Sequence, residues 1–247
     1  MALDLTDKTA NGNALTNHNS VSDVTTSLPS ITGTTHAAGF ALASSQYLTA
    51  ADSASLSITG SLTLEGWFKF SSTLVSNGDT YKLINKSEDV ASEHRAFMFF
   101  LTNAAGTIKL DFIMSPDGTY NGSNDISVAW TPSTGTWYHL AVTFNTSTKE
   151  VKFYVDGSQQ GSTGTTNDAT IENNAISFQI GATNADNTPK HFLDGVVDEV
   201  RVWNVVRTST EINNNKGIRM TGSESGLVAY YPFEALPSLG GYIFIQS

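Results

Sequence analysis

Apolar and polar residues alternate along most of the chain from residue 61 onward. A period of two residues is typical of β-strands, because successive side chains of a strand point to opposite faces of a sheet. In the segment 61–70, the predicted buried face carries Leu62, Leu64, Phe68 and Phe70. Further strands are predicted at residues 38–42, 46–49, 81–84, 97–101, 108–114, 125–129, 137–144, 151–155, 177–180 and 196–203.

Turn residues separate these segments and predict how they connect. The clearest hairpin joins residues 137–144 to 151–155 through a polar turn. One helix is predicted near residues 208–216, because Thr208 and Glu211 have the spacing of a capping box. Many short strands and little helix predict an all-β fold, a two-sheet antiparallel jelly-roll sandwich.

The predicted strand 196–203 contains a carboxylate among valines. The two-residue period places Asp198 on the face that carries most of these valines, so we expect it on or beside the core. A carboxylate there is costly unless hydrogen bonds or a metal ion compensate it. The predicted core face is Val196, Asp198, Val200 and Val202, and the opposite face is Glu199, Arg201 and Trp203.

The chain of 247 residues has the length of one large β-sandwich, and no repeat or boundary is visible before residue 236. We expect one domain at residues 1–235 and a C-terminal tail at residues 236–247. The net charge of −10 argues against nucleic-acid binding, because no basic patch suits the phosphates. The sequence has no cysteine for a disulfide or thiolate site, and no apolar stretch long enough for membrane insertion.

Several segments match a known family in their order and spacing. They read AAGFALASSQYLTAADSASLSITGSLTLEGWFKF, GTWYHLAVTFNTSTKEVKFYVDGSQQG, FLDGVVDEVRVWNVVRTSTEI and GLVAYYPFE. Together they resemble the concanavalin A-like lectin/glucanase superfamily, and in particular its laminin-G-like jelly-roll domains. The resemblance covers nearly the whole chain and implies two stacked antiparallel sheets, one of them concave. It is specific for the fold and much less so for function.

The resemblance also implies a structural calcium ion (Ca2+), held by the Asp of the D-x-V-R-V strand and by the loop after the first strand. Calcium prefers such oxygen ligands. The matching positions of this chain are Asp198, Asp7, Asn11, Gly12 and Asn13. The alternative is that Asp198 accepts backbone N–H groups and binds no ion.

The segment GLVAYYPFE departs from the family pattern. In relatives it often opens the domain, whereas here it lies near the other end of the chain. Some relatives do close with such a strand. We therefore expect it to complete a sheet beside Ala2–Leu5.

Carboxylates with catalytic spacing are missing from the sequence. Glucanases of this fold carry two glutamates and an aspartate spaced roughly E-x-D-x-x-E on one strand, and no such constellation occurs here. The five histidines show no metal-ligand spacing, and no G-x-S-x-G turn or phosphate-binding glycine loop is present. We expect no catalytic activity, with an atypical glycosidase as the alternative.

Two kinds of position could instead bind a ligand. One is a stripe of aromatic and charged residues on the predicted outer strand faces, around Glu65, Trp67 and Arg201, which could stack on sugars or simply form cross-strand pairs on a solvated face. The other is the set of rim loops at 88–95, 117–124 and 184–191. The candidate ligand-binding residues are Trp67, Lys69, Arg95, Tyr120, Asn184, Asp186 and Asn187.

These observations favour a non-catalytic binding module of a secreted or cell-surface protein that recognises carbohydrate or a glycoconjugate. No signal peptide is visible in this chain. The alternative is a structural or adhesive assembly subunit that contacts neighbouring protein subunits, with the apolar tail segment 242–246 pairing as a strand with a neighbour.

Overall fold

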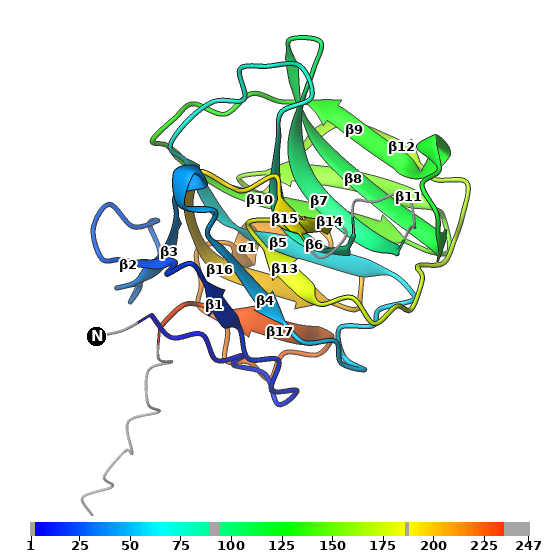
Figure 1. Cartoon of the computed structure of the whole chain (residues 1–247). Coiled ribbons are helices and arrows are strands. Elements are labelled where there is room, and N and C mark those ends of the chain that lie inside the picture. The colour runs from blue at the N-terminus through cyan, green and yellow to red at the C-terminus, as the bar shows by residue number, and fades with distance from the viewer. Residues whose placement is uncertain (1–2, 89–93, 186–187, 235–247) are drawn as a thin grey trace, which may run out of the picture.

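The computed structural model describes residues 3–88, 94–185 and 188–234. Two antiparallel sheets face each other as a sandwich (Figure 1). The seven-stranded sheet has the order β1-β4-β13-β6-β7-β8-β9, and the eight-stranded sheet has the order β12-β11-β10-β5-β16-β3-β2, with β17 also paired to β16. This arrangement confirms the predicted all-β jelly-roll sandwich.

The strands have the following bounds: β1 Thr16–His18, β2 Ser22–Val24, β3 Ala37–Phe40, β4 Tyr47–Ala50, β5 Leu62–Phe70, β6 Thr80–Ser87, β7 Arg95–Ala104, β8 Thr107–Gly118, β9 Asp125–Ala129, β10 Trp137–Asn145, β11 Glu150–Val155, β12 Ser158–Thr165, β13 Phe178–Ile180, β14 Thr183–Ala185, β15 Thr188–Lys190, β16 Gly195–Trp203 and β17 Leu227–Tyr231. The helical elements are η1 Leu42–Ser44, η2 Gly122–Asn124 and α1 Ser209–Asn215. Within the described residues, no helix is long and apolar enough to span a membrane.

The core lies between the two sheets and follows the predicted alternation. All four apolar residues predicted to be buried on β5 have no exposed surface, and Val142 of β10 pairs with Phe153 of β11 as the hairpin register requires. Facing aromatic rings, such as Phe99 and Phe153 with centroids 6.3 Å apart, join the two sheets across the core. Burial of these large side chains is the main source of stability for the sandwich.

The predicted core face of β16 is wrong at its beginning. Val197, rather than Val196, joins the core cluster with Val200, and Asp198 pairs with Trp67 on the outer side of the sheet. The cause is a β-bulge: the register with β5 shifts between Asp198 and Arg201, and Glu199 has a left-handed φ of 52°. One extra residue reverses the side-chain alternation of the strand.

The helix α1 covers the outer face of the eight-stranded sheet. Its N-cap is Thr208, whose side chain accepts from the backbone N–H of Glu211 while the Glu211 side chain accepts in return, so the predicted capping box is confirmed. Ile212 of α1 packs on Ala141 and Tyr154. The prediction of a solvated outer face is therefore wrong around Glu65 and Arg201, which are at most 1% exposed.

The segment before β1 lies along the free edge of β17. The backbone N–H of Asp4 donates to the carbonyl of Phe233 at 3.0 Å, and that of Lys8 donates to the carbonyl of Tyr230 at 2.9 Å. The expectation that GLVAYYPFE completes a sheet beside the N-terminal segment is confirmed for the described residues. The predicted tail 236–247 lies outside them.

Candidate functional site

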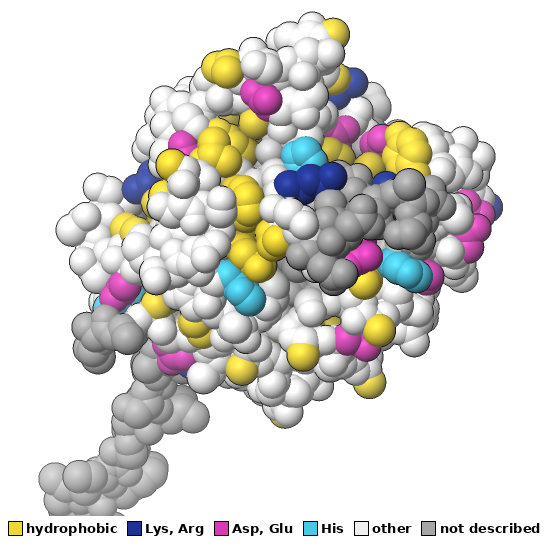
Figure 2. Space-filling model, in the orientation of Figure 1, with side chains coloured by type: hydrophobic (Ala, Val, Ile, Leu, Met, Phe, Trp, Pro, Cys, Tyr) yellow, Lys and Arg dark blue, Asp and Glu magenta, His cyan; other side chains and the backbone are white. Residues whose placement is uncertain are grey.

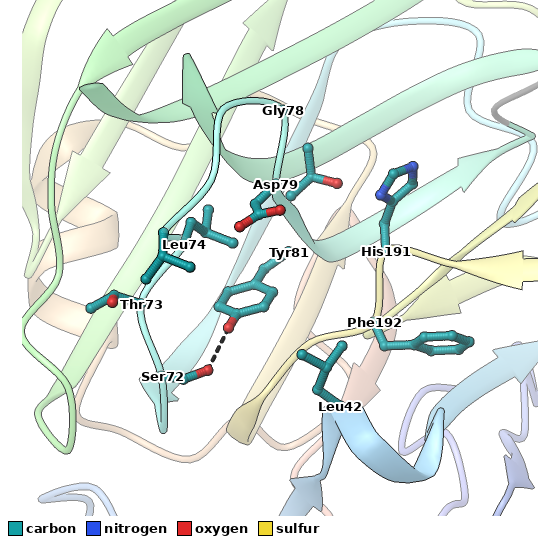
Figure 3. A pocket seen from close by; sticks show the side chains of 11 residues that line it. Leu42, Ser72, Thr73, Leu74, Gly78, Asp79, Tyr81, His191 and Phe192 are labelled. Atoms are coloured by element: carbon teal, nitrogen blue, oxygen red, sulfur yellow. Dashed lines mark hydrogen bonds between the residues drawn. The ribbon is translucent and has the colours of Figure 1, made fainter. Parts of the chain in front are cut away.

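A cavity of about 550 Å³ opens at the rim of the sandwich, beside the start of β6 (Figure 3). Its walls come from three segments that are distant in sequence: the start of η1, the connection between β5 and β6, and the two residues after β15. This volume is typical of small-molecule sites. The lining residues are Leu42, Ser72, Thr73, Leu74, Val75, Gly78, Asp79, Thr80, Tyr81, His191 and Phe192.

Tyr81 forms the floor of the cavity. Its ring packs parallel to Phe70 of the core, with centroids 6.3 Å apart. Its hydroxyl lies 2.6 Å from the hydroxyl of Ser72, which in turn donates to the carboxylate of Asp194. This chain of hydrogen bonds joins β6 to the connections on either side and fixes the position of the floor.

The wall formed by the β5–β6 connection is held by one buried asparagine. The side-chain amide of Asn103 donates to the carbonyl of Leu74 at 2.9 Å, and its backbone carbonyl accepts from Gly78 at 2.8 Å. The backbone N–H of Asn103 also donates to the carbonyl of Asp79 at 2.9 Å. Three hydrogen bonds from a residue of β7 therefore make this wall part of the rigid scaffold.

His191 and Phe192 form the opposite wall together with Leu42. His191 has a left-handed φ of 59°, and its carbonyl accepts from the backbone N–H of Lys82 at 3.3 Å. In Figure 3, Leu42 and Phe192 lie near each other on one side, and Leu74 lies on the other. The turn at His191 thus brings the aromatic ring that follows it to the cavity.

The cavity combines apolar and polar surface. Leu42 and Val75 are 45% and 80% exposed, which is unusual for large aliphatic side chains. On the face of the molecule in Figure 2, hydrophobic side chains gather in the middle of the surface beside histidine side chains. Asp79, Thr80 and His191 add hydrogen-bonding groups. The site suits a ligand that has both C–H surface and hydroxyl groups.

Two predicted ligand residues, Arg95 and Tyr120, meet at the other end of β6, on the outer face of the seven-stranded sheet. The Arg95 guanidinium lies 5.5 Å from the centre of the Tyr120 ring, and the Tyr120 hydroxyl donates to Asp125 at 2.9 Å. Arg95 starts β7, which pairs with Ser87 at the end of β6, whereas the cavity adjoins Thr80 at its start. These two residues therefore form a second cluster, separate from the cavity, which the sequence did not predict as a cluster.

A buried carboxyl group lies beside this cluster. Asp111 of β8 is 5% exposed and carries one oxygen without a hydrogen-bond partner. Burial, reinforced by the negative charge of Asp125, raises the pKa of Asp111 to about 7. The pKa of Asp125 is raised as well, mainly by burial, although the hydrogen bond from Tyr120 opposes the shift.

The remaining predicted ligand residues lie apart from the cavity. On the eight-stranded sheet, the Trp67 indole donates to the carbonyl of Lys216 at 2.6 Å, and the Lys69 ammonium donates to that of Ser27 at 2.9 Å. Asn184 is in β14, in the hairpin that leads to His191. Asp186 and Asn187 lie outside the described residues.

In the loop predicted to hold calcium, both carboxylate oxygens of Asp7 already accept hydrogen bonds from the protein. One carboxylate oxygen of Asp7 accepts from the backbone N–H groups of Thr9 and Tyr230, at 2.9 and 3.0 Å. The other accepts from the backbone and the amide of Asn13, at 3.0 and 3.1 Å, and from the Thr9 hydroxyl. A metal ion bound to this carboxylate would compete with these five hydrogen bonds.

Asp198 lies on the other side of β17 from this loop. Asn11 donates to the carbonyl of Val228 in β17 at 2.9 Å, and Gly12 makes the adjoining turn with a φ of 69°. Asp198 is in β16, where one carboxylate oxygen accepts from the backbone N–H of Glu199 and the other is buried without a partner. The predicted ligands therefore lie along both edges of β17.

Buried charges also surround Asp198. Its pKa is raised well above the usual value by burial and by the nearby carboxylates of Glu199 and Glu234. Within the described residues, no group of three or more Asp, Glu, His or Cys side chains has an arrangement that could hold a metal ion. Calcium binding stays a prediction from the resemblance.

Most of the cavity was missed by the sequence reasoning. Strand periodicity says nothing about Leu42 or the β5–β6 connection, because both lie outside regular strands. The sequence of the β5–β6 connection does contain one indication of an exposed apolar surface, because Leu74 and Val75 form an apolar pair within a polar stretch. His191 lies at the end of a rim loop that the sequence did identify.

Solved structures with a similar fold come from several sources. A Bacteroides ovatus protein named as a candidate carbohydrate binding protein is 20% identical, with a TM-score of 0.61 over 83% of this chain and 57% of that chain. Domain 4 of AbnA, a GH43 extracellular arabinanase from Geobacillus stearothermophilus, solved with arabinotriose, is 18% identical, with a TM-score of 0.57 over 86% of this chain and 93% of that chain. This chain thus spans little more than half of the Bacteroides protein.

A tailspike protein 2 of bacteriophage CBA120 has a TM-score of 0.60 at 13% identity, over 94% of this chain and 34% of that chain. No curated protein matches the sequence. The model of one family, the concanavalin A-like lectin/glucanases superfamily, matches residues 42–213, which include most of both sheets and helix α1. The chain therefore belongs to the concanavalin A-like lectin/glucanase superfamily.

Proposed function

We propose that this domain is a non-catalytic carbohydrate-binding module of a secreted or cell-surface protein, and that its ligand binds in the rim cavity. The observation that carries the proposal is the preformed cavity itself, with an apolar wall on each side and polar groups between them. Sugars present C–H faces and hydroxyl groups, so a site for them needs both kinds of surface. Because Asn103 holds one wall of the cavity in place, binding of a ligand costs less conformational entropy.

The similar folds support this proposal at a general level. Domain 4 of the Geobacillus arabinanase was solved with arabinotriose, and a Ruminococcus gnavus CBM40 domain with a TM-score of 0.50 was solved with sialyllactose. Both proteins are less than 20% identical to this chain, so they do not identify its sugar. A glycan array with the full chain would identify the class of ligand.

We expect Val75→Arg to weaken binding of any sugar found on the array by at least about tenfold. Val75 is 80% exposed at the cavity, so arginine would place a long charged side chain across the opening without disturbing the core. Isothermal titration calorimetry on both proteins would measure the change in dissociation constant.

Ile218→Arg is the matched control. Ile218 is 55% exposed and lies beyond α1, on the eight-stranded sheet, so the same charge is added away from the cavity. Unchanged affinity in Ile218→Arg and a large loss in Val75→Arg would support the site. Equal affinities would contradict the cavity as the site. An array without hits, together with self-association that rises with concentration, would favour the assembly role.

A further inference from the structure

Three buried carboxylates lie at the junction of β16 with the end of β17. Asp198 and Glu199 have no exposed surface, and Glu234 is 4% exposed. Asp198 experiences the negative charge of both other carboxylates. Like charges in a poorly solvated site repel strongly, so such a cluster is stabilised by a cation close by or by protonation of one carboxyl group.

An arginine side chain lies at this cluster. Arg219 follows α1, and its side chain is 10% exposed. Its Nε atom is 3.8 Å from Glu199, its Nη2 atom is 3.5 Å from Glu234, and its positive charge also acts on Asp198. The guanidinium group therefore contacts carboxylates from two different parts of the chain.

The backbone fixes both ends of this contact. The Nη1 atom of Arg219 donates to the carbonyl of Gly33 at 3.2 Å. The second oxygen of Glu234 accepts from the backbone N–H of Thr35 at 2.7 Å. A planar group with several fixed donors suits such a site, because it pairs with two carboxylates and a carbonyl at once. An ion placed between these carboxylates would have to displace the guanidinium.

We infer that Arg219, together with the Arg201 guanidinium 2.7 Å from Glu199, supplies the positive charge at the Asp198 cluster, in place of the calcium ion that the resemblance implies there. The loop around Asp7 agrees with this inference, because its carboxylate is used by five hydrogen bonds and lies across β17 from Asp198. The domain then folds and keeps its stability without bound calcium.

The first test uses the unmodified chain. Thermal unfolding is followed by circular dichroism with excess EDTA and again with millimolar calcium chloride, and the calcium content of the purified protein is measured by mass spectrometry. We expect the same melting temperature in both conditions, because a ligand that does not bind cannot stabilise the fold. A clear fall in EDTA, or close to one calcium per chain, would overturn the inference.

The second test removes the guanidinium. Arg219→Met is expected to lower the melting temperature by about 5–10 °C, because it leaves the buried Glu234 carboxylate without its cation and removes positive charge beside Asp198 and Glu199. Arg219→Lys, which keeps the charge, should recover part of the loss. Lys190→Met, a change at an exposed residue of β15, is the control for the lost charge and should shift the melting temperature little.

Equal melting temperatures for Arg219→Met and Lys190→Met would contradict a role for Arg219 at the cluster. If Arg219→Met does not fold, Arg219→Lys and the chelation test on the unmodified chain still show whether the fold depends on Arg219 or on calcium. A stable chain that contains no calcium supports the inference, and a calcium-dependent chain overturns it.

Discussion

Replacing Arg201 with methionine is expected to lower the free energy of unfolding by about 3–5 kcal/mol, or to prevent folding. Arg201 has no exposed surface, and its guanidinium lies 2.7 Å from Glu199 and 3.6 Å from Glu65. It also donates to the carbonyl of Asn215, the last residue of α1, and to that of Ile218, which follows the helix. Methionine fills similar volume but removes the cation beside Glu65 and the nearer of the two cations beside Glu199.

Urea denaturation, followed by tryptophan fluorescence, would measure the loss in Arg201→Met. Arg207→Met is the matched control, because Arg207 pairs with Glu211, which is 43% exposed, and stacks on Trp203 at 4.2 Å. Its loss should cost only about 1 kcal/mol. Similar losses in the two variants would show that the buried network adds little to stability.

Asp111→Asn is expected to stabilise the domain by about 2–4 kcal/mol at pH 8.5. The folded-state pKa of Asp111 is about 7, against an ordinary value of 3.8 for aspartate, so the folded protein binds this proton more tightly than the unfolded chain does. The stabilisation from the protonated carboxyl is therefore complete below about pH 4 and is lost as the pH rises through 7. Asparagine is neutral at every pH and avoids this loss.

The gain in Asp111→Asn should therefore shrink steadily as the pH falls toward 4. Urea denaturation at a series of pH values would measure it. Asp117→Asn makes the same chemical change on the same strand, at an exposed residue whose pKa is lowered by hydrogen bonds from Thr119. That control should not be stabilised at pH 8.5. A gain in Asp111→Asn that is independent of pH would contradict the assignment.

The sequence predicted the elements whose structure depends on near neighbours. The hairpin of β10 and β11 has the predicted faces because its inward residues alternate with polar ones across a short turn. The capping box at Thr208 and Glu211 depends only on residues three positions apart. Arg95 and Tyr120 lie close together in the structure, although nothing in the sequence indicated that they would meet, and their role in ligand binding stays a prediction.

Features that depend on distant contacts could not be predicted. The bulge at Glu199 reverses which face of β16 each side chain points to. The left-handed backbone of Glu199 cannot be recognised from the alternation of apolar and polar residues. The stripe around Glu65 appeared exposed because no local feature shows that α1 would cover it. The rim cavity is assembled from three separate connections, so no single segment carries its pattern.

The position of β17 has a consequence for synthesis of the chain. Residues 4–8 bind along β17, so this segment cannot take its final position until β17 has been synthesised. At ordinary translation rates that delay is roughly 10 to 45 seconds. Until then the second half of β16 is an unpaired edge, which is the kind of surface that aggregates in a nascent protein. Premature release of the chain before Leu227 would therefore leave this edge without its partner strand.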